Sequence, residues 1–423
     1  MEKGVRKIIF LFCLIFFIVV APGMVLYSQG YRINWEAKKI SQTGGLFLKV
    51  WPKQVEIYLD SRLKKKTDFF FGSALIENLL PKKYNVLIKK EGFHPWEKTL
   101  SIEEKKVQLA ENIILFSQNP SLNTLSQNVE KFWFLIDEKQ VILKELKETG
   151  GWALKIYDLG KGVKGHLIED KDIYPGADLI TLKSEDSKKI LLEVGIKESL
   201  KSYVLEIDKN PPVLIEKKEE LFLPEDVLTY QEFNGEVYYL DNSGHLFKTD
   251  RAFDSKTRIS KIPISILPET EYQIEKFADF IFIQEGQILY FLNPETKSFE
   301  KFFENLKGLA LSPDYKKLAY FSDYEIWILF LEEKNQPLFK KEGERLFLFR
   351  LSEKINQVIW LNSDYLVLTT ANNVKISEID ERDRINIVNF AQVENPEVFF
   401  NKTNKKLYIL SQETLYRSEN LLP

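Results

Sequence analysis

Hydrophobic and polar positions follow three successive patterns along the chain, and the first is a long apolar run. From Ile8 to Tyr27 no residue carries a charge. About 20 apolar residues, each rising about 1.5 Å, are enough for a helix that spans a hydrocarbon core of roughly 30 Å. We therefore expect one N-terminal transmembrane helix, and we place the tail and anchor at residues 1–30.

The same run also has features of a signal peptide. Val19–Ala21 resembles a signal-peptidase site, but Pro22 would follow the cut directly, and the run is longer than an ordinary signal peptide core. Cys13 follows the bulky Phe12 in mid-run, which argues against a lipoprotein signal. We predict an uncleaved signal-anchor, with cleavage as the alternative.

The arrangement of the chain predicts the side of the membrane on which its bulk lies. The basic residues on the two sides of the run nearly balance; they are Lys3, Arg6 and Lys7 before it and Arg32, Lys38 and Lys39 after it. A short tail before a lone span, with a large domain after it, is typical of a single-pass protein whose long domain is exported largely regardless of charge. We expect a cytoplasmic tail, and C-terminal domains outside the cytoplasmic membrane.

The second pattern is a strand-like alternation that begins at Gly44, after a linker at residues 31–43. Runs at 46–50, 55–59, 84–88 and 96–102 alternate with a period of two and are separated by turn residues. Short strands at this spacing predict a small antiparallel β-sandwich at residues 44–118.

Four strings in this sandwich occur in the order of a known family. They are P-K-Q-V-E-I-Y-L-D-S at 52–61, T-D at 67–68, L-P-K-K-Y-N-V at 80–86 and K-E-G-F at 90–93. The region resembles the PEGA domain, with its P-x-x-A-x-V-Y-I-D-G, T-P, L-x-P-G-x-Y-x-V and K-E-G-Y strings. Ser61, Asp68 and Lys82 depart from that pattern at turn positions. The resemblance implies a β-sandwich of bacterial and archaeal surface proteins, with a binding or spacer role and no catalytic residue.

Three residues of the sandwich are candidate partner contacts: Phe70, His94 and Trp96. Phe70 lies in the row Phe69–Phe71, where a strand would turn at least one ring outward, toward the next domain rather than a ligand. The simpler alternative for the other two is that Trp96 packs on the sandwich and His94 is solvated. The basic run Arg62–Lys66 is interpreted as a solvated loop rather than a phosphate or lipid contact.

The third pattern is a degenerate repeat of about 40 residues that fills residues 119–423. Its clearest copy is L-A-L-S-P-D-Y-K-K-L-A-Y-F-S-D at 309–323, and a second copy begins at Val358. The copies resemble the S-P-D-G-K-x-I-A-F signature of Tol-type and WD-repeat-like propellers. One such sheet cannot bury both faces alone, so neighbouring sheets must stack around an axis. We predict a β-propeller of about seven blades, with residues 122–134 supplying the strand that closes the ring.

Composition and motifs narrow the function by exclusion. Lys and Arg number 59 against 62 Asp and Glu, and a formal charge of -3 argues against nucleic-acid binding. Cys13 is the only cysteine and lies in the apolar run, so no intramolecular disulfide or cysteine zinc site is expected. No serine-hydrolase, P-loop, dinucleotide, zinc-protease or calcium-loop motif appears. We predict no cofactor, no metal and no catalytic residue.

Paired carboxylates are the remaining enzymatic hypothesis, because some glycosidases place two acids in a propeller funnel. Asp314 and Asp364 stand at the repeat's turn, where an aspartate caps backbone N–H groups. The sequence therefore favours a non-catalytic binding or scaffolding protein of the bacterial cell envelope. Its expected partners are the membrane and either an envelope protein or a cell-wall polysaccharide, with a cell-wall glycan-processing enzyme as the alternative.

Overall fold

The computed structural model describes residues 3–423 except 36–37, 149, 198 and 218–222. The described chain is mostly β-strand and divides into two compact units. The first unit contains residues 1–119, 380–388 and 422–423, and the second contains residues 120–379 and 389–421. The segment 380–388 thus lies with the N-terminal residues, which the sequence patterns did not anticipate.

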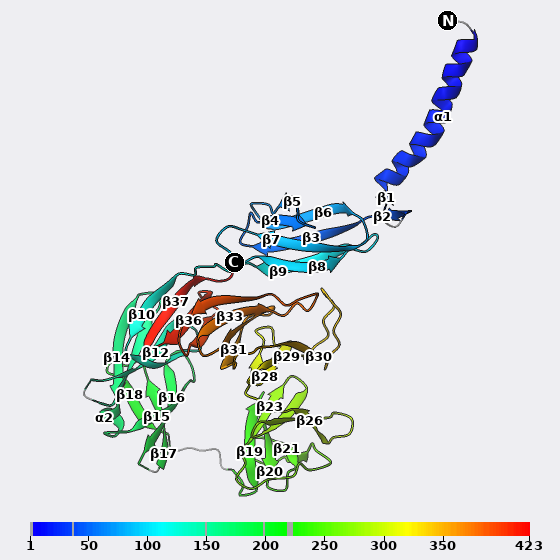
Figure 1. The fold of residues 1–423 in the computed structure, drawn as a ribbon. Coiled ribbons are helices and arrows are strands. Elements are labelled where there is room, and N and C mark those ends of the chain that lie inside the picture. Colours follow the sequence, from blue (N-terminus) through cyan, green and yellow to red (C-terminus); the bar gives the residue numbers. More distant parts are fainter. Residues whose placement is uncertain (1–2, 36–37, 149, 198, 218–222) are drawn as a thin grey trace. The chain divides into compact units, whose positions relative to one another are not determined.

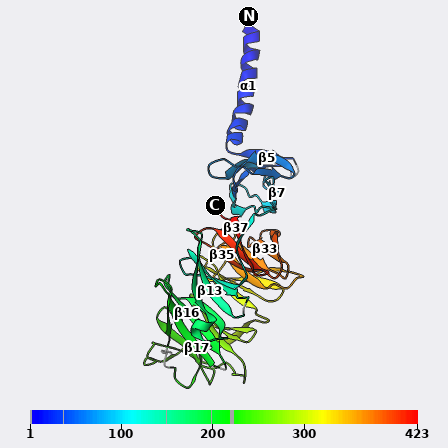
Figure 2. The same ribbon diagram turned by 90° about the vertical axis from the view of Figure 1, so that its left-hand side faces the viewer.

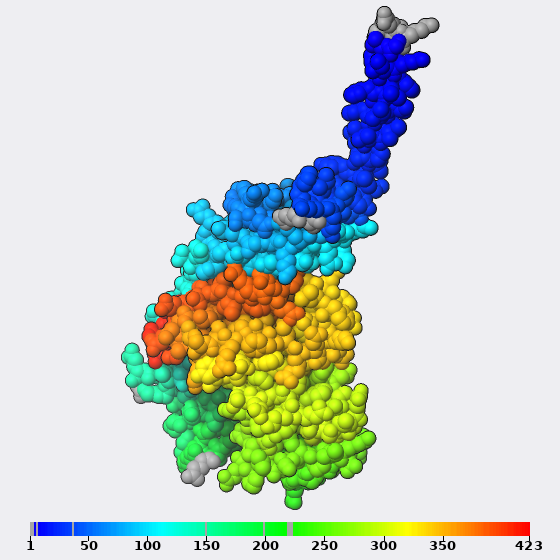
Figure 3. Space-filling view, turned by 45° about the vertical axis from the view of Figure 1, so that its right-hand side comes forward, coloured from blue at the N-terminus to red at the C-terminus, as the bar shows by residue number. Residues whose placement is uncertain are grey.

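A single long apolar helix begins the chain, as predicted. Helix α1 spans Lys3–Ser28 and includes Pro22 (Figure 3), and most of its described side chains are exposed. Its segment 7–28 is long and apolar enough to cross a membrane, a property that a signal sequence shares. The side chains of Lys3 and Arg6, which entered the prediction of orientation, lie outside the described residues.

The segment predicted as a linker, residues 31–43, contains a short hairpin of β1 (Tyr31–Asn34) and β2 (Lys39–Gln42). Arg32 ties this hairpin to its neighbours, because its guanidinium donates to the carbonyl of Tyr27 at 2.7 Å and to Asn78 Oδ1 at 2.9 Å. The same guanidinium stacks 3.6 Å from the centre of the Tyr27 ring. The end of α1 is therefore fixed to the first unit by hydrogen bonds as well as by the chain.

The first unit is a two-sheet sandwich (Figure 1). One sheet has the order β6-β3-β9 and the other β5-β4-β7-β8. The strands are β3 (Gly44–Trp51), β4 (Glu56–Leu59), β5 (Arg62–Lys66), β6 (Ser73–Leu79), β7 (Lys83–Lys89), β8 (Trp96–Ser101) and β9 (Val107–Ile114). Alternating residues of both sheets, such as Leu46, Ile57 and Val86, form a dry core.

Three details of the sandwich differ from the prediction. Strands β3 and β9 run parallel, and alternation cannot reveal this because the side-chain period is the same in both directions. The basic run Arg62–Lys66 is not a loop but the edge strand β5. Phe69–Phe71 lie in a turn rather than in a strand, and all three rings are exposed.

The second unit is built of seven four-stranded sheets among its described residues, which confirms the predicted propeller. Blades 1 to 3 are β11 (Val129–Phe134), β12 (Gln140–Leu146), β13 (Trp152–Asp158), β14 (Val163–Glu169); β15 (Asp178–Ser184), β16 (Lys189–Ile196), β17 (Ser199–Glu206), β18 (Val213–Glu216); and β19 (Val227–Phe233), β20 (Glu236–Asp241), β21 (Leu246–Thr249), β22 (Thr257–Arg258). Helix α2 (Asp170–Ile173) joins blades 1 and 2.

Blades 4 to 6 are β23 (Tyr272–Phe277), β24 (Phe280–Glu285), β25 (Ile288–Leu292), β26 (Phe299–Phe303); β27 (Gly308–Leu311), β28 (Lys317–Phe321), β29 (Glu325–Phe330), β30 (Arg345–Arg350); and β31 (Gln357–Asn362), β32 (Tyr365–Thr369), β33 (Asn373–Glu378), β34 (Ile387–Gln392). Blade 7 has the order β10-β37-β36-β35, with β10 (Leu122–Gln127), β35 (Glu397–Asn401), β36 (Lys406–Ser411) and β37 (Thr414–Asn420).

The ring closes through blade 7, where β10 from the start of the unit pairs with β37 from its end. This confirms that the segment beginning at Leu122 supplies the closing strand, although residues 129–134 form the first strand of blade 1 instead. First strands of several neighbouring blades are in contact, as β31 is with β27 and β35 and as β19 is with β23. Apolar cores are shared by blades 1 and 2, by blades 3 and 4, by blades 4 and 5 and by blades 7 and 1. Blades 1 and 2 lie side by side in Figures 1 and 2.

Candidate functional site

The first strands of four consecutive blades line a half-open pocket of about 430 Å³. These strands are β31, β35, β11 and β15, and we call the space between them the inner pocket. It is lined by Phe132, Trp133, Phe134, Ile136, Leu182, Lys183, Ser184, Gln357, Glu397, Val398 and Phe399. Pockets of this size with apolar walls and a few polar groups are typical ligand sites.

Aromatic rings form the wall of the inner pocket. Phe134 and Phe399 stack with their centres 4.3 Å apart and an angle of 11° between the ring planes. Tyr408 packs edge-on against Phe134 at 4.8 Å, so the stacked pair is held from behind by the core of blade 7. Lys131 lies 5.5 Å from the centre of the Trp133 ring. The wall is therefore preorganised, with its ring faces largely engaged within the protein.

Glu397 is the only acid among the described residues that line the inner pocket. Burial raises the pKa of its carboxyl, and the charge of Lys131 partly offsets that effect. Water reaches the side chain, but the surrounding blades displace much of the bulk solvent, which penalises the charged form. A cationic group that entered the pocket would find a carboxylate in an environment where charge pairing is stronger than in water.

Backbone and side-chain hydrogen bonds position the polar rim. The Gln357 amide donates to the carbonyl of Val398 at 3.0 Å and accepts from the Val398 N–H at 2.9 Å, which holds β31 beside β35. The Ile136 N–H donates to Ser184 Oγ at 3.1 Å, which holds the loop after β11 beside β15. The Ile136 side chain projects from that loop and is 68% exposed. An apolar wall with a charged and polar rim results.

The three predicted contact residues belong to the first unit, and none of them lines the inner pocket. Phe70 is exposed at the tip of its turn. The ring of Trp96 lies in the sandwich core and leaves a partner almost no surface, and His94 is half-buried with its N–H bonded to the carbonyl of Phe116 at 2.8 Å. Whether a partner contacts these residues stays a prediction.

Sequence reasoning missed the inner pocket itself. Its aromatic residues come from strands more than 250 residues apart, so no local motif contains them. The one available signal was the string F-W-F at 132–134, within the segment already predicted to close the ring.

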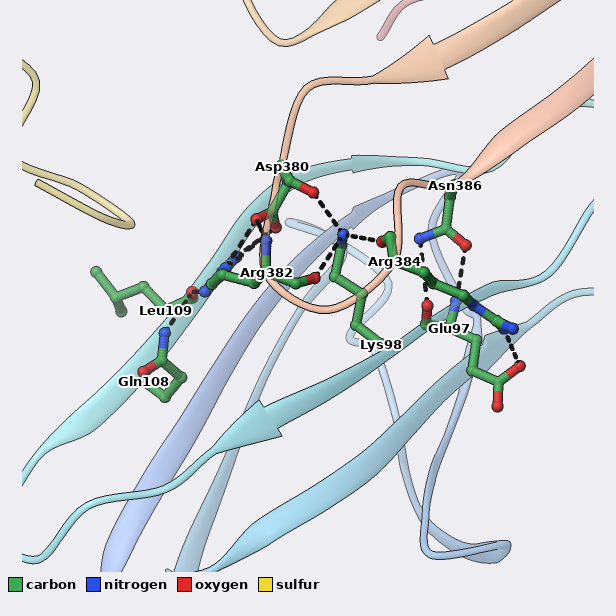
Figure 4. Close-up of polar contacts among 8 residues, drawn as sticks. All are labelled: Glu97, Lys98, Gln108, Leu109, Asp380, Arg382, Arg384 and Asn386. Atoms are coloured by element: carbon green, nitrogen blue, oxygen red, sulfur yellow. Dashed lines mark hydrogen bonds and ion pairs between the residues drawn. The ribbon is translucent and has the colours of Figure 1, made fainter. Parts of the chain in front are cut away.

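A second polar cluster holds the segment 380–388 against the sandwich within the first unit (Figure 4). We call residues 380–386 the strap. The fully buried Lys98 extends its amino group to three carbonyl oxygens of the strap, those of Asp380, Arg382 and Arg384, at 2.6, 2.9 and 2.6 Å. The Arg382 guanidinium donates in turn to the carbonyl of Leu109 at 2.6 Å.

The strap also covers the open edge of β8, which is the last strand of its sheet. Asn386 accepts from the Glu97 N–H at 3.4 Å and donates to the Glu97 carbonyl at 3.2 Å, while Asp383 accepts from the Thr99 N–H at 2.7 Å. Arg384 pairs with the Glu97 carboxylate. Side chains of the strap thus take the hydrogen bonds that another strand would otherwise seek, which is a structural role.

The aspartates of the repeat signature bind their own turns. Asp314 accepts from Ser312 Oγ at 2.5 Å and from the Lys316 N–H at 3.2 Å, and it pairs with the buried Lys317 at 2.8 Å. In the second copy the capping atom belongs to Asn362, whose Oδ1 accepts from the Asp364 N–H at 2.8 Å. These contacts agree with a turn-capping role for Asp314.

The Asp314 contacts predict a pH-dependent contribution to stability. Burial acts to raise the pKa of Asp314, but hydrogen bonds from Lys317 and Ser312 outweigh it and lower the pKa to about 2. A carboxyl whose pKa is lower in the folded state than in the unfolded state stabilises the folded protein at pH values above its unfolded pKa. This contribution is lost as the pH falls toward 2. Asp314→Asn is expected to lower the free energy of unfolding by about 2 kcal/mol at pH 6 and by little near pH 2.

Urea unfolding between pH 6 and pH 2 measures this difference. The exposed Asp254→Asn provides the control, because the same charge is removed outside the repeat turn. If the free energies of unfolding of the wild type and Asp314→Asn differ by the same amount across this pH range, the prediction is contradicted.

No group of three or more metal-binding side chains is assembled among the described residues. No family model and no curated protein matches the chain. Several solved structures are similar over the propeller. YCF48 from Cyanidioschyzon merolae is 7% identical, with 71% of this chain and 99% of that chain covered and a TM-score of 0.44.

The Cps50 (Swd1) β-propeller domain of Myceliophteria thermophila is 11% identical, with 71% and 99% covered and a TM-score of 0.41. An oligogalacturonate lyase in complex with manganese is 10% identical, with 71% and 93% covered and a TM-score of 0.43. At these identities the similarity concerns the fold, and no functional residue is carried over.

Proposed function

We propose that this chain is a membrane-anchored, extracytoplasmic and non-catalytic binding protein of the cell envelope. Helix α1 holds it in the cytoplasmic membrane, and the inner pocket receives a segment of a partner protein. The observation that carries the proposal is the aromatic wall of the inner pocket beside a lone partly desolvated acid, Glu397. The bound segment presents an apolar side chain to the wall and a lysine or arginine to Glu397.

The geometry of the rings favours a protein segment over a polysaccharide. Sugars bind by stacking on open aromatic faces, whereas Phe134 and Phe399 each cover one face of the other, Tyr408 packs against Phe134, and Lys131 lies over Trp133. The remaining ring edges and the exposed Ile136 suit an aliphatic or aromatic side chain. An apolar centre with a charged rim is the usual anatomy of a protein-binding site.

The single acid also bears on the glycosidase alternative. Hydrolysis of a glycosidic bond by the usual mechanisms requires two carboxyl groups on opposite sides of the bond. The described lining of the inner pocket supplies one, Glu397, and Asp314 is bonded to its own turn. These features support a binding role for the pocket.

A single cysteine at the rim of the inner pocket tests on which side of the membrane the propeller lies and whether a protein binds in the pocket. In a Cys13→Ser background, Ile136→Cys is labelled on intact cells with a membrane-impermeant maleimide that carries benzophenone. We expect labelling without permeabilisation and, after irradiation, a covalent adduct with one protein. Glu397→Gln is expected to reduce the adduct about fivefold, because a charge-assisted contact at a solvent-accessible carboxylate contributes about 1 kcal/mol.

Tyr315→Cys, which is 71% exposed on another blade, is the matched control and is expected to label without forming that adduct. Labelling only after permeabilisation would place the propeller on the cytoplasmic side. An adduct unchanged by Glu397→Gln would remove the inner pocket from the proposal. Saturable binding of purified cell-wall polysaccharide that is lost in Trp133→Ala would favour the glycan alternative, and turnover of that polysaccharide would favour the enzyme.

A further inference from the structure

The most exposed apolar cluster of the sandwich is the turn between β5 and β6, which we call the aromatic turn. Its three rings, Phe69, Phe70 and Phe71, are 64%, 74% and 75% exposed. Phe69 and Phe70 meet edge to face at 5.5 Å, so the rings form one patch. Three adjacent exposed aromatic side chains are costly in water and point to a surface that is covered in use.

Hydrogen bonds hold this turn in one shape. The Asp68 carboxylate accepts from the Phe71 N–H at 2.5 Å and from the Ser73 N–H and hydroxyl at 2.8 and 2.7 Å. Gly72 accepts from the Val50 N–H at 2.9 Å with a φ of +67°, and a Cβ there would lie 2.4 Å from the Val50 carbonyl. The backbone therefore presents the rings outward as a fixed feature rather than as a mobile loop.

Positive charge surrounds the aromatic turn. It directly follows β5, in which all five residues, Arg62–Lys66, are exposed and four are basic. Lys49 lies opposite Ser73 on β3 and adds a further exposed cation. Two of the nearby acids are engaged, since Glu56 pairs with Lys66 at 2.9 Å and Asp68 binds the turn. Apolar rings beside lysines and an arginine are the combination that binds an anionic lipid surface.

The aromatic turn and the anchor lie at opposite ends of the same strand. At the start of β3, the Thr43 N–H donates to the Gly30 carbonyl at 2.9 Å, directly after α1. The end of β3 carries the aromatic turn through the bond between Val50 and Gly72. The eight residues of β3 separate the two ends by about 25 Å. Trp35, 81% exposed in the hairpin after α1, suits the interfacial position that tryptophan favours in membranes.

We propose that the aromatic turn and β5 form a second membrane contact, which inserts Phe69–Phe71 among anionic phospholipid headgroups and holds the sandwich along the bilayer. The proposal rests on the proposed anchoring by α1. An anchored sandwich never leaves the leaflet, so its effective concentration there is high, and a contact too weak to bind a free protein suffices. The basic side chains of the adjacent edge strand favour an anionic surface as the occupant.

Spin labels on the full chain test this contact. In a Cys13→Ser background, Phe70→Cys is labelled and the protein is reconstituted in nanodiscs of phosphatidylcholine and phosphatidylglycerol at 7:3. Accessibility to oxygen and to a water-soluble nickel chelate is measured by power saturation. The ratio of oxygen to nickel accessibility is expected to be about threefold higher at position 70 than at the similarly exposed Tyr315→Cys, because the label sits among the headgroups, where oxygen is more accessible and the nickel chelate less.

Two comparisons test whether the contact depends on anionic lipid and on the basic residues of β5. Pure phosphatidylcholine, or Arg62→Glu with Lys64→Glu, is expected to return the ratio at position 70 to that at position 315. A label at Val19→Cys reports separately on the anchor. A membrane-buried signal at position 19 with a water-exposed label at position 70 in both lipids would overturn the second contact and leave the anchor intact. A water-exposed label at position 19 would overturn the anchor itself.

Discussion

Replacement of Lys98 by methionine is expected to release the strap, so that trypsin cleaves after Arg382 and Arg384 about 100-fold faster than in the wild type. The side chain of Lys98 is fully buried, and its amino group is the shared donor for three strap carbonyls. Methionine keeps the length and apolar stem of lysine but leaves those oxygens without this donor. Loss of such charge-assisted bonds costs about 3 kcal/mol, which corresponds to the expected change in cleavage rate.

The remaining contacts of the strap depend on the same geometry. Asn386 and Asp383 reach the backbone of β8 only when the strap follows that strand, as Figure 4 shows for Asn386. The Arg382 guanidinium is oriented by the Asp380 carboxylate at 2.7 Å on its way to the Leu109 carbonyl. Opening of the strap therefore exposes the edge of β8 together with the two arginines.

Lys89→Met is the matched control, because Lys89 is exposed on β7 of the same sheet. Its cleavage rate at the strap is expected to equal that of the wild type. Equal rates in Lys98→Met and Lys89→Met would show that the three carbonyls do not depend on Lys98.

These contacts mark the limit of what the sequence revealed. The apolar helix, the two sandwich sheets and the seven blades follow from periodicity, since burial on one face imposes it locally. Lys98 lies at an ordinary polar position of an alternating strand, and its partners are backbone atoms about 280 residues later. Backbone carbonyls leave no trace in sequence, so neither the strap nor the burial of this lysine was predictable.

The conformation of the turns could be predicted from the sequence only in part. Asp314 was recognised as a turn cap from its place in the repeat, because the acceptor and its donors are close in sequence. The aromatic turn was misplaced in a strand, since three phenylalanines favour strands and the decisive bonds come from Asp68 and Gly72. The wall of the inner pocket combines Phe134 with Phe399, a pairing that only the closed ring produces.

The substitution Gly244→Ala is expected to disrupt blade 3, because among the glycines of the second unit Gly244 is the one where an added Cβ comes nearest to another atom. Gly244 lies between β20 and β21 with a φ of +83°. A Cβ at this position would lie 1.8 Å from the carbonyl oxygen and 2.9 Å from the carbonyl carbon of Ile264. Both atoms belong to the backbone, so no rotation of a side chain relieves the overlap.

The surrounding bonds prevent the turn from moving away. The Ile264 N–H donates to the Gly244 carbonyl at 2.9 Å, and the Asp241 carboxylate accepts from the N–H groups of Ser243 and His245 at 3.0 and 2.8 Å. Ile264 itself packs in the core that blade 3 shares with blade 4. Relief of the overlap therefore breaks either the turn or that core, at a cost of about 4 kcal/mol or more.

The substitution Gly235→Ala distinguishes the energetic cost of the steric overlap from that of a strained backbone conformation. Gly235 has a φ of +80° in the preceding turn of the same blade, but a Cβ there meets no atom within 4 Å. It is expected to cost about 1 kcal/mol, the usual cost of a left-handed alanine. Hydrogen exchange of peptides from β20 to β22 measures the loss of backbone protection in both variants. An equal loss in the two would contradict the prediction that steric overlap with Ile264 makes Gly244→Ala the more damaging change. The inner pocket is formed by other blades, so unchanged labelling of Ile136→Cys distinguishes local loosening of blade 3 from collapse of the whole ring.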